Sequence, residues 1–316
     1  MFGCAWACAL ATQATLSTPL VDPLDLRNHR PVALAFLRIP HLGQALANGQ
    51  REMSISVIGA NDIRKDALTL EDAETWRINA RLRKGTAAGE WFVELPIIVR
   101  GGGWLDPIID GWHKTVLRAT YALRENTKMF GSRIYTAGSH DFGSAFGIGD
   151  LTVGGAKNLG PHWTLRAAIK LPTGNASKLL GSGAPDLGIA ANYSATLGMK
   201  WSAYAQFGFV AQGRATKMKG TNSVVDQETL AIMYSPSSKN VWILQWDAER
   251  APLSTSSSVV SGTHRTLSLG YRHKISANGT LDLFFSEDAD IVDGRQPWIA
   301  NIGPDFTAGL RYVWRF

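Results

Sequence analysis

Apolar and polar residues alternate strictly along most of this chain, which is the pattern of a β-strand with two different faces. Within residues 75–83 the apolar positions are Trp76, Ile78, Ala80 and Leu82, and the positions between them are basic or polar. No face of a helix places four residues at that spacing. The pattern recurs in roughly a dozen segments, so the chain is predicted to be all-β.

Composition narrows the class of β protein. Charged residues are 18% of the 316 residues, against roughly 25% in soluble domains, and no run of about 18 apolar residues would form a transmembrane helix. A transmembrane barrel remains, because alternation hides its apolar face from averaged hydropathy. We therefore expect a monomeric, up-and-down antiparallel β-barrel that spans a membrane, with about 12 strands.

The connections between the expected strands alternate in length. Short turns are expected at 84–89, 158–161, 197–199, 235–240 and 276–279, and longer connections at about 60–73, 101–146, 173–185, 213–225, 250–262 and 287–303. Short periplasmic turns and long extracellular loops are typical of outer-membrane barrels. The pattern predicts a Gram-negative outer-membrane location with both termini in the periplasm.

The C-terminus carries a specific signal. Tyr312, Trp314 and Phe316 lie at every second position, alternating with Arg311, Val313 and Arg315, and the last of them ends the sequence. This arrangement resembles the insertion signal that the barrel assembly machinery reads, so that machinery is an expected partner. The alternative is a soluble sandwich, whose last strand would expose an aromatic stripe to water.

The N-terminal part divides into two expected segments. Residues 1–14 contain both cysteines, Cys4 and Cys8, and are interpreted as the remnant of a signal peptide, or alternatively as an ordinary frayed end. Residues 15–50 form a short pre-barrel segment, which either stays in the periplasm or enters the barrel as a plug. The barrel itself is expected to run over 51–316.

Several stretches resemble a known family. They are Asp22-Pro23-Leu24-Asp25-Leu26-Arg27-Asn28-His29-Arg30-Pro31, Glu74-Thr75-Trp76-Arg77, Trp104-Leu105-Asp106 and Ile109-Asp110-Gly111-Trp112-His113. From Asp22 to Phe316 the chain resembles bacterial outer-membrane barrels of domain-of-unknown-function family 3187. The resemblance implies the barrel and the export route, and no activity. Residues 170–174 also resemble a strand-end motif of barrels proposed to move small aromatic or apolar compounds.

If apolar faces meet lipid, the charged residues of the strands point into the lumen. The expected lumen and selectivity residues are Arg77, Arg81, Arg83, Arg166, Lys170 and Arg311, joined by Arg272 and Arg315, with Glu90, Glu94, Asp247, Glu249 and Asp282 as partial counter-charges. A cationic excess there favours anions. The alternative is a paired network that serves only stability. Because these charges are spread over strands, nucleic acid is not expected as a partner.

The connection from 101 to 147 is the longest, and long loops in compact folds tend to be functional. It is expected to fold over the barrel mouth as a gate or constriction, formed by Trp104, Asp106, Asp110, Trp112 and His113. The two aspartates lie four apart and would share one face of a helical turn. A helix-start role for Asp106 is favoured over a cation or metal site.

An enzyme is the least favoured class. Ser139, His140 and Asp141 are consecutive, so their side chains cannot align as a catalytic triad. No metal-binding set of His and Cys and no phosphate-binding glycine loop is present, so no metal, cofactor or catalytic residue is expected. Thr263 and Arg265 suit contact with phosphates of lipopolysaccharide, and outer-membrane lipid is the other expected partner.

These observations predict a channel for a small anionic or aromatic solute, gated by the 101–147 connection. The second interpretation is a non-conducting barrel with a binding or structural role. The third is an outer-membrane enzyme that modifies lipids.

Overall fold

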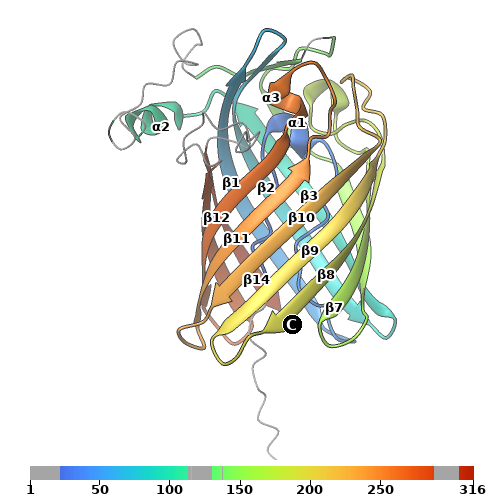
Figure 1. Ribbon diagram of the computed structural model, residues 1–316, viewed down its shortest axis with the longest axis vertical. Helices are drawn as coiled ribbons and strands as arrows, with labels where there is room; N and C mark the ends of the chain where they lie inside the picture. Colours follow the sequence, from blue (N-terminus) through green and yellow to red (C-terminus); the bar gives the residue numbers. More distant parts are fainter. Residues whose placement is uncertain (1–21, 113–114, 116–129, 137, 288–305) are drawn as a thin grey trace, which may run out of the picture.

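The computed structural model describes residues 22–112, 115, 130–136, 138–287 and 306–316. Strands dominate the described residues (Figure 1). They are β1 (Arg51–Lys65), β2 (Thr69–Thr86), β3 (Gly89–Gly101), β4 (Arg133–Thr136), β5 (Ala145–Ile148), β6 (Leu151–Asn158), β7 (Trp163–Leu171), β8 (Asp186–Thr196), β9 (Trp201–Gln212), β10 (Val224–Tyr234), β11 (Asn240–Arg250), β12 (Thr263–Lys274), β13 (Gly279–Glu287) and β14 (Phe306–Arg315). The helical turns are α1 (Pro31–Leu34), α2 (Asp106–Trp112), η3 (Ala176–Lys178) and α3 (Ser258–Ser261).

Twelve strands close into an antiparallel barrel, which confirms the predicted fold class. β1 closes it by pairing with β2 on one side and with β14 on the other. Two short strands are additions: β4 pairs with the upper end of β2, and β5 continues the line of β6 along β3. A closed sheet has no free edge, so backbone groups within the membrane are satisfied by their neighbours.

The alternation of apolar and polar residues gives each strand an apolar outer face and a polar interior face. In β7, Trp163, Leu165 and Ile169 are exposed, whereas Thr164 and Arg166 between them are completely buried. The polar residues thus form the inside and the apolar residues the outside, as in other transmembrane barrels. No helix in the described part of the chain has the length and hydropathy needed to span a membrane.

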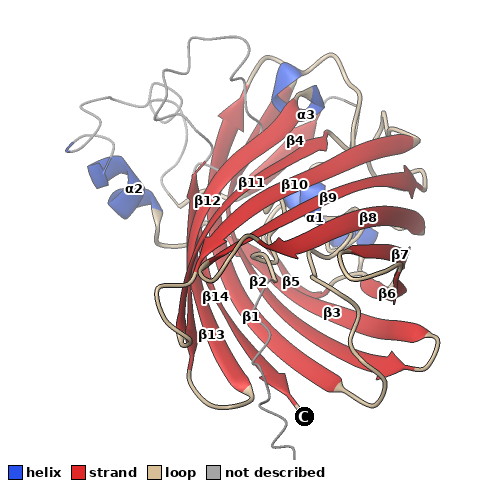
Figure 2. Cartoon of the chain, turned by 60° about the horizontal axis from the view of Figure 1, so that its bottom comes forward, coloured by secondary structure: helices blue, strands red, loops and turns tan. Residues whose placement is uncertain are grey.

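The two ends of the barrel differ. One end carries the short turns and the C-terminus, and the other carries α1, α2, α3 and the longer connections (Figures 1 and 2). One expected long connection is wrong: in place of a loop over 60–73, β1 and β2 continue as a hairpin joined by residues 66–68. Fifteen paired positions hold this hairpin in register, so it extends the barrel wall.

Residues 22–50, the inner segment, lie inside the barrel. Most of them are buried, and α1 is seen within the barrel at the long-loop end (Figure 1). Leu24 and Leu26 pack with Tyr204 and other side chains of the wall, and Leu37 and Ile39 form a second cluster with Phe92. The apolar core of this protein is therefore in the lumen. The proposed signal peptide lies outside the described residues.

Candidate functional site in the barrel lumen

The inner segment runs through the barrel from the short-turn end to the long-loop end and back again. Asp22 starts it at the short-turn end, where its carboxylate lies 2.7 Å from the Arg315 guanidinium. Arg30, just before α1, is bound at the opposite end by Asp62 and Glu71, at 3.1 and 2.7 Å. The chain then returns and enters β1 at the short-turn end. Both limbs of this hairpin fill the lumen along its length.

Side-chain amides of the wall hold the backbone of the inner segment. Gln245 Oε1 accepts from the Leu24 N–H at 2.8 Å, and Gln245 Nε2 donates to the Leu24 carbonyl at 3.0 Å. Gln227 accepts from the N–H of Ile39 and donates to the carbonyl of Leu37. Asn158 accepts from the N–H of Ala45 and donates to the carbonyl of the same residue. Because an amide offers a donor and an acceptor, each one replaces a rung of a β-ladder.

A buried polar cluster lies midway, around Arg38 and His41. Arg38 Nη2 lies 3.2 Å from Asp247 Oδ1, and Nη1 lies 3.4 Å from Glu249 Oε2. Arg38 Nε also donates to His41 Nε2 at 3.0 Å. Since a guanidinium has no acceptor, that ring nitrogen must accept, and the imidazole is neutral.

The six basic side chains expected in the lumen all lie in the interior, and each contacts a carboxylate. They are Arg77, Arg81, Arg83, Arg166, Lys170 and Arg311, all at most 5% exposed. Glu94 binds both Arg77 and Arg81, and Glu90 binds both Arg83 and Arg166. Asp282 binds Arg311 at 2.7 Å and also Arg272. Lys170 Nζ lies 2.6 Å from Asp150 Oδ2. A shared carboxylate between two guanidiniums is a charge-assisted arrangement that fixes their geometry.

The described interior does not show the expected cationic excess. Thirteen Asp and Glu side chains are buried there or in the adjoining loops, against ten Lys and Arg side chains. The inner segment contributes both signs, since Asp25 binds Arg81 and Arg38 binds Asp247. Anion selectivity by the six basic residues therefore stays a prediction.

The described part of the 101–147 connection divides between two places. Ile134 and Phe142 pack with Val32 and Phe36 of the inner segment in one buried cluster at the long-loop end. α2 projects beside the wall at the long-loop end in both views (Figures 1 and 2). Trp104 is 57% exposed, whereas Asp106 is buried and accepts from Asn61 Nδ2 and from the Phe130 N–H, each at 2.9 Å. The backbones of Asp110 and Trp112 belong to α2, but their side chains, and all of His113, lie outside the described part. The gating role of this connection stays a prediction.

Residues 139–141 have separate partners. Ser139 Oγ accepts from the Lys219 N–H, His140 packs edge-on against Phe142, and Asp141 pairs with Arg133 at 2.7 Å. These contacts hold the three side chains apart, as expected for consecutive residues. Among the described residues, no three His, Cys, Asp or Glu side chains are grouped so as to hold a metal.

The residues of the expected insertion signal lie on β14 or directly after it, and all face outward. Tyr312, Trp314 and Phe316 are about 40–50% exposed, and the rings of the last two are 4.7 Å apart. The motif at 170–174 binds the junction between β5 and β6: Thr173 Oγ1 donates to the Gly149 carbonyl, and the Gly174 N–H donates to Asp150. This motif therefore connects two neighbouring parts of the wall.

A protein-family model described as "Protein of unknown function (DUF3187)" matches residues 3–316. The chain belongs to this family. No curated protein matches the DUF3187 chain. Among solved structures, the COG4313 outer membrane channel from Pseudomonas putida F1 is 14% identical, with a TM-score of 0.55 over 86% of this chain and 97% of that one. The translocator domain of the autotransporter NalP from Neisseria meningitidis is 11% identical, with a TM-score of 0.45 over 86% and 90%. The likeness to the first shows that the DUF3187 chain has the fold of an outer-membrane β-barrel.

Sequence reasoning missed the polar residues that hold the inner segment of this DUF3187 protein. Arg38 and His41 lie outside every strand, so alternation gives no direction for their side chains. Gln227, Gln245 and Asn158 do occupy polar strand positions, and amides among charged inward residues are the signal that could have identified them. An amide in a lumen suits a backbone better than an ion.

Proposed function

We propose that this protein is an outer-membrane channel for a small polar solute, closed in this structure by its own inner segment. The observation that carries the proposal is that residues 22–50, together with the charged side chains of the wall, fill the lumen. Eight-stranded barrels are just narrow enough for side chains to fill, whereas a barrel of twelve strands has additional room.

The inner segment is built so that it can separate from the wall. Within the described chain it joins the barrel covalently at one place, before Arg51. Its contacts with the wall combine apolar packing, as at Leu24 and Ile39, with ion pairs and hydrogen bonds from side-chain amides, and water can replace the polar contacts when the lumen hydrates. The charged and amide lining that would then face water favours a polar solute over an aromatic hydrocarbon.

The orientation follows from the connections. We place the short turns and the C-terminus in the periplasm, because outer-membrane barrels have short periplasmic turns and long extracellular loops. The inner segment then enters and leaves from the periplasmic side. In this arrangement the 101–147 connection, on the outer side, would regulate access from the medium.

The test is conductance of purified protein in planar bilayers, with the inner segment either removed or locked. A Cβ atom built on Gly270 would lie 3.1 Å from Leu24 Cγ, so cysteines at positions 24 and 270 can form a disulfide across the lumen. Cys4 and Cys8 are replaced by serine in every variant. We expect rare openings from wild type, steady conductance when residues 22–46 are deleted, and silence when the disulfide is formed.

Reduction of the disulfide must restore the openings, which controls for damage to the barrel. A matched variant carries Leu24→Cys alone, because a side chain at position 270 would clash with intact Leu24; it cannot form the disulfide and should open at least as often as wild type. A deletion variant that folds, as shown by heat-modifiable migration, and still does not conduct would overturn the channel proposal. It would favour the alternative of a non-conducting barrel in which the inner segment is a permanent core.

A further inference from the structure

The short-turn end carries basic residues that the lumen network does not use. They are Arg51, Lys84, Lys157, Lys200, Lys239 and Lys274, so each short turn is next to at least one lysine. None of these six forms an ion pair within the described residues. The acids at this end, Asp22, Glu52 and Glu90, are each paired with an arginine at the lumen. The rim therefore presents cations without exposed carboxylates in its described turns.

Two of these cations are direct neighbours on the outer face. Arg51 of β1 is opposite Lys84 of β2 in the strand register, and both belong to the face that points away from the lumen. Like charges at directly opposite positions are unfavourable unless an anion lies between them. The repulsion between Arg51 and Lys84 therefore destabilises the isolated chain, and no ion pair within the described residues offsets it.

The same row continues across two more strands. Trp91 of β3 is opposite Lys84, and Gly155 of β6 is opposite Trp91. Lys157 follows two residues after Gly155, on the same face and exposed. Because Gly155 has no side chain, the outer face of the indole is open on that side. Across the four strands, the outer face thus presents Arg51 and Lys84, then the indole of Trp91, then the open position at Gly155 with Lys157 beyond it.

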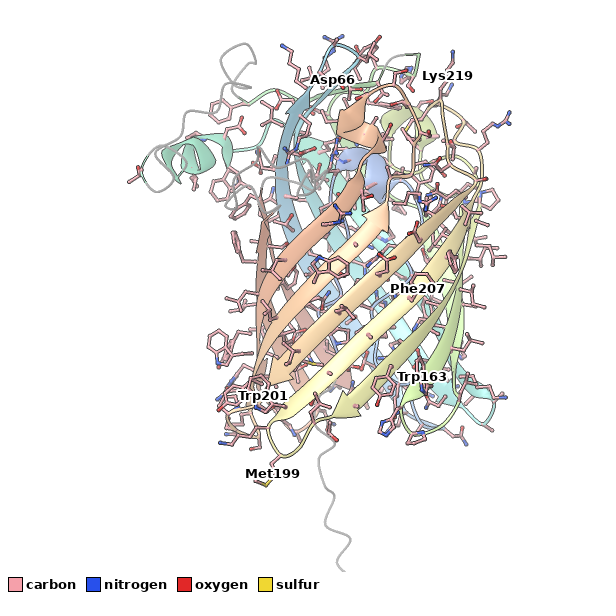
Figure 3. The ribbon with its side chains drawn as sticks, in the orientation of Figure 1. Asp66, Trp163, Met199, Trp201, Phe207 and Lys219 are labelled. Atoms are coloured by element: carbon pink, nitrogen blue, oxygen red, sulfur yellow. The ribbon has the colours of Figure 1, made fainter. Side chains whose placement is uncertain are left out.

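The row lies at the level of an aromatic belt. Trp163 and Trp201 are outside the barrel close to its short-turn end, while Phe207 is midway up the wall (Figure 3). Trp91, Trp242 and Trp314 are also exposed near turns of this end. Tryptophans gather at the boundary between hydrocarbon and headgroups, so the cations next to them are at headgroup height.

We propose that Arg51, Lys84 and Lys157, with Trp91 between them, bind the phosphate headgroup of an anionic phospholipid. The guanidinium and ammonium groups pair with phosphate oxygens, and the indole packs on the glycerol and upper acyl chain. The choice of phospholipid over lipopolysaccharide rests on the orientation proposed above, which puts this end in the periplasmic leaflet. The phosphate also resolves the repulsion between Arg51 and Lys84.

The experiment measures lipid retained by the full-length protein in native mass spectrometry, after reconstitution in phosphatidylcholine with or without phosphatidylglycerol. Wild type should retain phosphatidylglycerol preferentially. The variant R51Q/K84Q/K157Q should lose that preference, by about fivefold for each cation removed. The matched control K178Q/K217Q/K219Q removes three exposed cations from the long-loop end and should keep it. Trp91→Leu, which leaves every charge in place, should weaken retention without abolishing it.

Equal loss in the triple variant and its control would overturn the proposal, because it would show only a general effect of net charge. A second arm adds lipopolysaccharide, and displacement of phosphatidylglycerol from the wild-type row by lipopolysaccharide would overturn the phospholipid assignment. Heat-modifiable migration verifies that each variant is folded. Lipid retention is read on the closed protein without any conductance, so failure here and failure of the channel proposal are separate outcomes.

Discussion

Arg38 of the inner segment and Asp247 of β11 form an ion pair at 3.2 Å in the middle of the lumen, 209 residues apart in sequence. Both side chains are about 4% exposed. A buried pair of this kind adds little to stability by itself, but either partner left alone is costly. The pair therefore acts mainly as a specific latch: it is satisfied only when the inner segment lies in this position.

Replacement of Arg38 by alanine should release the latch. The buried carboxylate of Asp247 would lose its guanidinium, which destabilises the closed state by about 3–5 kcal/mol. We expect open probability in bilayers to rise strongly, with heat-modifiable migration unchanged. The double variant Arg38→Met with Asp247→Leu removes both charges and should return toward the closed behaviour. If the single variant stays as silent as wild type, the pair does not hold the closed state.

Removal of the side-chain amide of Gln227 or Gln245 should also destabilise the closed state, but by less than removal of Arg38. Gln227→Leu or Gln245→Leu leaves one backbone N–H and one carbonyl of the inner segment without their partners, at a cost of about 1–3 kcal/mol for each buried group. Asn79→Leu is the matched control, since this buried amide accepts from Arg77 of its own strand. Protease sensitivity of residues 22–50 in intact protein should increase in the first two variants and not in the control.

The barrel could be predicted from the sequence because its signal is local. Residues such as Trp163 and Arg166 report their face through strand alternation alone, and the structure has them outside and inside as expected. The sign of the net charge in the interior could not be derived from alternation. It depends on which charges the wall shares with a segment of irregular backbone, such as Asp25 against Arg81.

The length of β1 and β2 illustrates a second limit. Residues 60–73 contain several charged side chains and no clean alternation, which favoured a loop. In the structure those charges have partners: Asp62 and Glu71 both bind Arg30 of the inner segment. A tertiary contact therefore stabilises strand residues that local pattern assigns to a connection.

The C-terminal strand offers a test of assembly apart from gating. Trp314 and Phe316 face outward and touch no part of the lumen network, so their truncation should leave the closed state unchanged. We expect W314A/F316A to reduce the amount of barrel inserted in the outer membrane severalfold, measured by fractionation and heat-modifiable migration. W242A, at another exposed tryptophan near the short turns, controls for simple loss of an aromatic side chain. Equal insertion of both variants would contradict the interpretation of Trp314 and Phe316 as an insertion signal.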